Sequence, residues 1–171
     1  MEDIAGVAGV SKPVLYQHFP SKRELFLELL DINLRTLTDA LNDSLQSQKN
    51  NKERVHDAIR AYHAYIARED GAYRLVFESG VSGEADVSVR LEAFRKGFVK
   101  AIARIISADA QLSLAEAELL GRGLMGLAQV SARYWLEAAA GPDGPDFSLD
   151  RASELICRLA WRGISRFPKE A

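Results

Sequence analysis

The sequence has little that would cross-link the chain or hold a metal ion. Cys157 is the single cysteine among 171 residues, so neither an internal disulfide nor a cysteine metal cluster is expected. No uninterrupted apolar run approaches the ~18 residues of a membrane span, and the N-terminus lacks the basic-then-apolar pattern of a signal peptide. The 22 Lys and Arg against 24 Asp and Glu exclude generic coating of DNA but allow a local basic patch. We therefore expect a soluble, cytoplasmic protein.

Residues that favour strands are also scarce. Val, Ile and Thr together number 21, whereas Ala and Leu together number 45; the first group favours strand and the second favours helix. No proline occurs between Pro20 and Pro142, so long helices can run through this region without a forced break. The composition predicts an all-α fold.

Capping residues and hydrophobic periodicity predict where the helices lie. Ser11 stands at the N-cap of a short helix, and Ser21 with Glu24 and Ser113 with Glu116 have the spacing of capping boxes. Helices are predicted over residues 2–7, 11–19, 21–45, 53–68, 72–78, 84–107 and 113–140, followed by a last helix that carries Leu155 to Phe167.

The N-terminal segment has the spacing of a helix-turn-helix. Ala5 is small where two helices would cross, and Gly9 supplies the positive φ of a tight turn. Val10, Leu15 and Phe19 are expected to close a miniature core. Such a unit places its second helix in the major groove of DNA. An ordinary helical hairpin is the alternative that the spacing alone leaves open.

The residue identities in this segment are more specific than the spacing of its apolar positions. Residues 8–19 read AGVSKPVLYQHF and residues 21–25 read SKREL. Together they resemble the signature of TetR-type (tetracycline-repressor-like) transcriptional regulators, in which a Gly-Val-Ser turn leads into a recognition helix reading Leu-Tyr-x-His-Phe. The resemblance implies a helix-turn-helix DNA-binding domain over residues 1–24 and an antiparallel helical effector-binding and dimerisation domain over residues 25–171.

Members of this family carry a further helix before the unit. Here the chain begins at Met1, where that helix should have ended, so we expect a DNA-binding domain truncated at its N-terminus. The resemblance implies a homodimeric, ligand-responsive regulator, a repressor released from a palindromic operator in double-stranded DNA by a small, mostly apolar effector. The alternative is a small-molecule-binding helical dimer that no longer reads DNA because its first helix is absent.

The resemblance also assigns DNA contacts to particular side chains. The groove-facing positions are Lys12, Pro13, Val14 and Gln17, and the phosphate-contacting positions are Tyr16, His18 and Lys22. Elementary chemistry agrees, because a helix N-terminus beside Lys12, Lys22 and Arg23 would form a compact positive site near phosphates.

Two of these positions suit base edges and two have structural alternatives. Val14 can contact a thymine methyl group, and Gln17 can pair bidentately with adenine. For Tyr16 the alternative is packing against the helical domain. For His18 the alternative is a structural imidazole.

Aromatic side chains on several helices indicate an effector pocket in the second domain, as the resemblance implies. An apolar wall with few polar groups suits a mostly hydrophobic small molecule. The side chains expected to line it are Tyr62, Phe77, Phe94, Phe98, Met125 and Gln129. Plain core packing is the alternative for each of them.

The last two long helices have the composition of a pairing surface. Small residues let another helix approach closely, and the helix over 113–140 is apolar nearly all round, which implies burial on both sides. A four-helix bundle between two subunits would give the two-fold symmetry that palindromic operators mirror. The expected interface residues are Leu120, Gly123, Leu124, Leu127, Leu155, Leu159 and Ile164. Packing within one chain is the alternative.

Residues that match motifs of catalysis or cofactor binding lack the structural surroundings that such motifs require. Residues 121–126 read GRGLMG, which matches the dinucleotide fingerprint, but the match lies inside a predicted helix with no strand before it. His18, His56 and His63 lack metal-binding spacing, and nothing orients a nucleophile near His63. We therefore predict a protein that is not an enzyme and has no cofactor or metal site.

Overall fold

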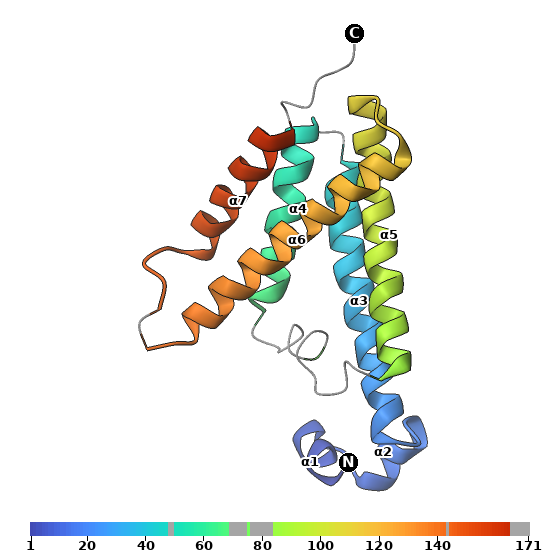
Figure 1. Cartoon of the computed structure of the whole chain (residues 1–171). Coiled ribbons are helices and arrows are strands. Elements are labelled where there is room, and N and C mark those ends of the chain that lie inside the picture. Colours follow the sequence, from blue (N-terminus) through green and yellow to red (C-terminus); the bar gives the residue numbers. More distant parts are fainter. Residues whose placement is uncertain (48–49, 69–74, 76–83, 143, 165–171) are drawn as a thin grey trace.

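The structure, a computed structural model, describes residues 1–47, 50–68, 75, 84–142 and 144–164. Within these ranges the regular structure is all-α, as predicted, with an N-terminal helix-turn-helix and a helical C-terminal domain (Figure 1). The helices are α1 (Glu2–Ala8), α2 (Lys12–His18), α3 (Lys22–Gln46), α4 (Asn51–Ile66), α5 (Ala85–Ala110), α6 (Leu114–Ala139) and α7 (Leu149–Ile164). None of these helices is long and apolar enough to cross a membrane.

Helix α3 connects the two parts of the molecule. Its 25 residues span about 37 Å at 1.5 Å per residue, and Figure 1 shows α1 and α2 at one end of it. Beyond its first two turns, α3 buries a stripe of leucines at spacings of three or four residues, which form the centre of the core: Leu30, Leu34, Leu37, Leu41 and Leu45. Against α3 lie α4 and α5, which α6 contacts in turn, and α7 packs on α4 and α6.

Local capping chemistry sets several helix starts. At α6 the capping box is complete: the Ser113 backbone N–H donates to Glu116 Oε2 at 2.8 Å, and the Glu116 N–H donates to Ser113 Oγ at 3.3 Å. At α3 the Glu24 N–H donates to Ser21 Oγ at 3.1 Å. Helix α4 begins two residues earlier than predicted because Asn50 Oδ1 accepts the Glu53 N–H at 3.0 Å.

Other details of the prediction were wrong or fall outside the described residues. Ser11 occupies the N-cap of α2, but within the described chain its hydroxyl makes no capping hydrogen bond; a proline in the first turn supplies the helical φ instead. Helix α5 continues to Ala110 and ends where Gln111 adopts a left-handed φ of 55°. Of the helix predicted over 72–78 only residue 75 is described, and Phe167 lies beyond the described residues.

A buried histidine ties three helices of the domain together. His63 of α4 is fully buried, with Nδ1 2.8 Å from Ser153 Oγ on α7 and Nε2 3.2 Å from Ser131 Oγ on α6. Burial lowers the pKa of His63 below its usual 6.5, and a hydrogen bond to the Ala128 backbone offsets part of that shift. The neutral imidazole therefore acts as a polar bridge inside the core.

Candidate functional site

The N-terminal pair of helices is held by a small internal contact. Ala5 of α1 and Leu15 of α2 are the buried side chains of the two helices. Gly9 has a φ of 68°, the left-handed conformation predicted for it, and the Val10 N–H donates to the Ala5 carbonyl at 3.1 Å. Val10 itself is 40% exposed, so its predicted place in the miniature core was wrong. Two helices of seven residues enclose little more than one alanine and one leucine.

The remaining surface of α2 faces outward. Leu15 is its buried residue, whereas Val14 and Tyr16 are 39% and 42% exposed. All seven side chains expected to contact DNA are exposed on α2 or on the first residue of α3: Lys12, Pro13, Val14, Tyr16, Gln17, His18 and Lys22. The His18 ring lies 6.4 Å from the Phe19 ring, centroid to centroid. The structure thus brings the predicted groove and phosphate contacts together on one short segment.

The three cations expected to form a positive site differ in their partners. Lys12 Nζ lies 3.3 Å from Glu2 Oε2 in a well-exposed pair, which is weak enough to exchange for a phosphate. Within the described residues Lys22 makes no ion pair. Arg23 instead pairs with Glu84 and Asp86 at the start of α5, so its guanidinium connects α3 with α5.

A cavity lies between α3, α4, α5 and α6. It comprises about 530 Å³ of empty space, including its opening to solvent. Its walls are the side chains of Leu41, Leu45, Val55, Ala58, Ile59, Tyr62, Phe94, Phe98, Ile102, Leu124, Met125 and Ala128. Except for the Tyr62 hydroxyl, these side chains carry no oxygen or nitrogen. The space therefore suits an apolar molecule.

Four of the six side chains expected around the pocket line this cavity, namely Tyr62, Phe94, Phe98 and Met125. The Phe94 and Phe98 rings stack almost parallel, 6.4 Å apart with a 4° angle between planes. Gln129 is not among the lining residues, because it follows Ala128 and points about 100° further around α6. Phe77 lies outside the described residues. The aliphatic lining residues were missed because their periodicity equals that of ordinary core.

The expected dimer residues divide between an inner and an outer face. Leu120 and Leu124 pack within the chain beside Ala103, Ile106 and Ala117, and Leu127 packs against the main core. Gly123, Leu155 and Leu159 are exposed. Ile164 is the last residue of α7, and its side chain is not among those that the structure describes. Sequence reasoning missed the large apolar residues that α6 does expose: Leu114, Leu119, Val130 and Tyr134.

Comparison with known sequences identifies relatives of this chain. Residues 1–29 match the family model for bacterial regulatory proteins of the tetR family. The HTH-type transcriptional activator FasR of Mycolicibacterium smegmatis is 35% identical over 168 residues, which cover 98% of this chain and 74% of FasR. The nucleoid occlusion factor SlmA of Idiomarina loihiensis is 31% identical over 83 residues, which cover 48% of this chain and 42% of SlmA.

Solved structures share the fold. A TetR-like transcriptional regulator from Rhodococcus sp. RHA1 superposes with a TM-score of 0.73 at 21% identity and covers 95% of this chain and 82% of its own. The TetR family transcriptional regulator PfmR from Thermus thermophilus gives a TM-score of 0.69 at 21% identity over 94% and 86% of the two chains.

Proposed function

The chain belongs to the TetR family of bacterial transcriptional regulators, and on this premise we propose that it binds a palindromic operator as a homodimer and responds to an apolar effector. The family consists of transcriptional regulators and not of enzymes. We assign DNA binding to residues 1–24 and effector binding and dimerisation to residues 25–171. Helix α3 begins in the first of these regions and ends in the second.

The observation that carries the DNA-binding part is the exposure of α2. In a packed helical hairpin the apolar side chains would be covered, but Val14 and Tyr16 are open to solvent beside polar Lys12 and Gln17. Lys12, Pro13, Val14 and Gln17 are assigned to the major groove. Tyr16, His18 and Lys22 are assigned to phosphates, which set the position of the helix without reading sequence.

The effector part of the proposal rests on the cavity. Ligand pockets are mostly apolar clefts, and the cavity wall, which includes the stacked rings of Phe94 and Phe98, is apolar. The effector is therefore a small molecule whose buried part is hydrophobic. Helix α3 contributes Leu41 and Leu45 to the wall, so the helix that lines the cavity also carries the helix-turn-helix.

The dimer part of the proposal rests on the outer face of α6 and α7. Both helices expose large apolar side chains, and exposed apolar patches commonly mark an interface. Gly123 has no atom within 4 Å of the position that a Cβ would take, which leaves room for a partner helix. The proposed contact surface consists of Leu119, Gly123, Val130, Tyr134, Leu155 and Leu159.

The direction of regulation has two candidates. In the first, the chain is a repressor, and the effector releases it by binding more tightly to a state whose recognition helices no longer match the half-sites. The second candidate is an activator, which is favoured by the 35% identity to FasR, whose name describes an activator. A reporter gene behind the operator distinguishes them: expression falls on adding a repressor and rises on adding an activator.

Selection of bound duplexes from a random DNA pool tests the proposal. The full chain is incubated with the pool at physiological salt, and retained duplexes are sequenced over successive rounds. We expect enrichment of a palindrome with half-sites about one helical turn apart, because two copies of α2 would read it. Recovery of duplexes without any shared sequence would contradict a DNA-reading function and would favour a dimer that only binds small molecules.

A further inference from the structure

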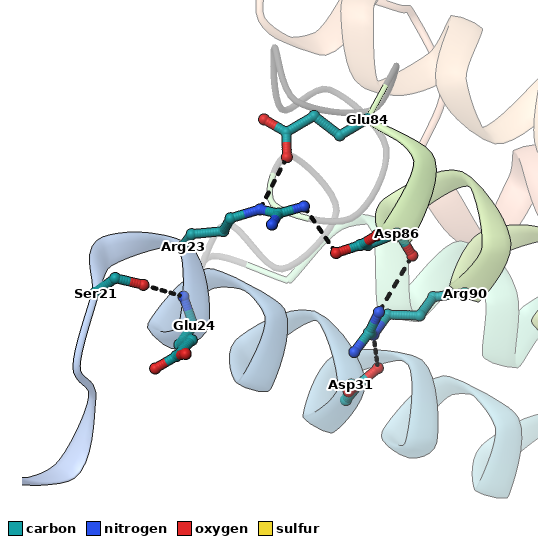
Figure 2. Close-up of polar contacts among 7 residues, drawn as sticks. All are labelled: Ser21, Arg23, Glu24, Asp31, Glu84, Asp86 and Arg90. Atoms are coloured by element: carbon teal, nitrogen blue, oxygen red, sulfur yellow. Dashed lines mark hydrogen bonds and ion pairs between the residues drawn. The ribbon is translucent and has the colours of Figure 1, made fainter.

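Five charged side chains connect the first turns of α3 with the start of α5 (Figure 2). Arg23 of α3 donates through Nε to Glu84 Oε2 at 3.2 Å and through Nη2 to Asp86 Oδ2 at 2.7 Å. Arg90 of α5 donates through Nε to Asp31 Oδ1 at 2.9 Å and through Nη1 to the Asp86 carbonyl at 3.2 Å. We call these five residues the α3–α5 joint. Each helix contributes charges of both signs, so the joint specifies one alignment of the two helices.

The joint lies where the helix-turn-helix is attached. Among the described helices, the backbones of α1 and α2 lie close to each other and to no other helix. The orientation of α2 relative to the domain is therefore transmitted through the first turn of α3, which begins at Lys22. Arg23 is the next residue, and its guanidinium is held by two carboxylates of α5.

The same stretch of α5 reaches the apolar cavity. Phe94 lines the cavity and also lines an outer groove that contains Asp31 and Arg90. Arg90 precedes Phe94 by four residues, so the two side chains are neighbours on one face of α5. From Asp86 to Phe94 the helix rises about 12 Å. A displacement of Phe94 therefore reaches both ion pairs of the joint along a single short segment of helix.

We infer that the α3–α5 joint is the connection through which occupancy of the cavity sets the orientation of α2. Arg23, Glu84 and Asp86 are positioning residues: they act on DNA binding through the alignment of α3. This inference rests on the proposed function, because it needs the cavity to take an effector and α2 to read DNA. The pairs are about half-exposed, so each adds little to folding stability. A shift of α5 by about 1–2 Å breaks their geometry, since hydrogen bonds weaken steeply with distance and angle.

The test measures the position of the helix-turn-helix without DNA. Spin labels are placed on cysteines introduced by Val7→Cys in α1 and Lys100→Cys in α5, both exposed positions. Cys157 is replaced by serine, although burial raises the pKa of its thiol to about 11 and slows its labelling. Pulsed electron paramagnetic resonance then gives the distribution of distances between the two labels.

Removal of the α5 carboxylates is expected to change that distribution. In the Glu84→Gln/Asp86→Asn variant we expect the mean to move by about 1–2 Å or more and the distribution to broaden. Glu137→Gln, which breaks the exposed Arg133–Glu137 pair on α6, is the matched control and should leave it unchanged. Indistinguishable distributions for the two variants would overturn the inference.

Two substitutions of Arg23 separate the joint from a direct phosphate contact. Arg23→Lys keeps the positive charge but lacks the planar fork that reaches two carboxylates, so it should broaden the distribution as the carboxylate variant does. Arg23→Glu should broaden it further, and Arg23→Glu/Asp86→Arg should narrow it again by reversing the pair. Failure of this rescue would show that Arg23 does not act through Asp86.

An apolar dye tests the connection to the cavity. N-phenyl-1-naphthylamine fluoresces on entering apolar sites, so its binding is measured independently of its effect. We expect the bound dye to shift the wild-type distribution towards that of Glu84→Gln/Asp86→Asn, and to bind this variant more tightly than the wild type and without a further shift, because a ligand favours the state that it binds better. A dye that binds and leaves the wild-type distance unchanged overturns the inference. A dye that does not bind contradicts the proposed effector cavity, whereas the carboxylate and rescue variants still test the joint.

Discussion

The helix-turn-helix and the helical domain are built in opposite ways. Helices α1 and α2 bury Ala5 and Leu15 and expose nearly everything else. Helix α3 alone buries six leucines, and α4 to α7 add an aromatic-lined cavity and a buried histidine bridge. In the first region the chemistry lies on the surface and the packing is slight. In the second the packing is extensive, and the cavity and the histidine bridge lie inside it.

This difference explains why the sequence of the first region indicates the function and the sequence of the second indicates the fold. A surface that meets DNA needs particular donors, acceptors and charges at particular places. A core needs only apolar side chains of suitable volume, and many sequences satisfy that condition. The N-terminal residues therefore identify the activity, and the domain residues identify the architecture.

The largest expected contrast concerns stability. Leu37 is completely buried and Leu29 is 38% exposed, both on α3. Leu37→Ala should lower the free energy of unfolding by about 2–5 kcal/mol, because it removes contacts and leaves a cavity. Leu29→Ala should change it by less than about 0.5 kcal/mol. Urea unfolding followed by circular dichroism measures both, and similar losses would contradict the assigned core.

The second contrast lies within the DNA-contacting surface. Gln17→Ala should cost about 1–3 kcal/mol on the selected operator and relax the preference at one base pair. Lys22→Ala should weaken operator and random duplex alike and reduce the salt dependence of binding by about one ion. Arg122→Ala, at an exposed cation on α6, serves as the control. Equal losses on both duplexes for both variants would contradict this division of roles.

The third contrast concerns the pH dependence of folding stability, which arises in the helical domain. His63 has a folded-state pKa below its unfolded value because of burial, so its contribution to stability is present above about pH 6.5 and is lost as the pH falls. Between about pH 7.5 and 5.5 the urea midpoint should drop, with a contribution from this group of at most about 1.4 kcal/mol per pH unit. His63→Gln should flatten that part of the profile. An unchanged profile in His63→Gln would contradict the assignment.

The smallest contrast compares two serines at helix starts. Ser113 completes a capping box on α6, whereas Ser11 makes no side-chain capping bond at α2 in the described chain. Ser113→Ala should cost about 1 kcal/mol, and Ser11→Ala should stay within about 0.5 kcal/mol. Thermal unfolding of the two variants measures the difference. A larger loss for Ser11→Ala would contradict the observed hydrogen bonding.

Features set by local chemistry were predictable from the sequence. The left-handed turn at Gly9 and the capping box at Ser113 depend on residues within four positions of each other, and both were expected. Three cavity-lining side chains, Tyr62, Phe94 and Phe98, were found because aromatic residues at helical spacing stand out from an aliphatic background.

Features set by the tertiary arrangement could not be predicted from the sequence. Arg23 and Glu84 are separated by 61 positions, and no local signal indicates that exposed charges so far apart will meet. Helix α6 is apolar on most sides, so its periodicity does not distinguish the inward Leu120 and Leu124 from the outward Leu119 and Val130. Gln129 was misplaced for the same reason, since a neighbouring residue on a helix points about 100° away.

The most direct test of the central claim is a pair of binding measurements on the full chain. Fluorescence anisotropy gives its affinity for the palindrome enriched from the random pool and for a duplex of the same composition in scrambled order, at the same physiological salt. We predict binding to the palindrome that is tighter by a factor of about 10³ or more, the ratio typical of specific DNA-binding proteins. Equal affinity for the two duplexes would contradict the claim that α2 reads DNA sequence.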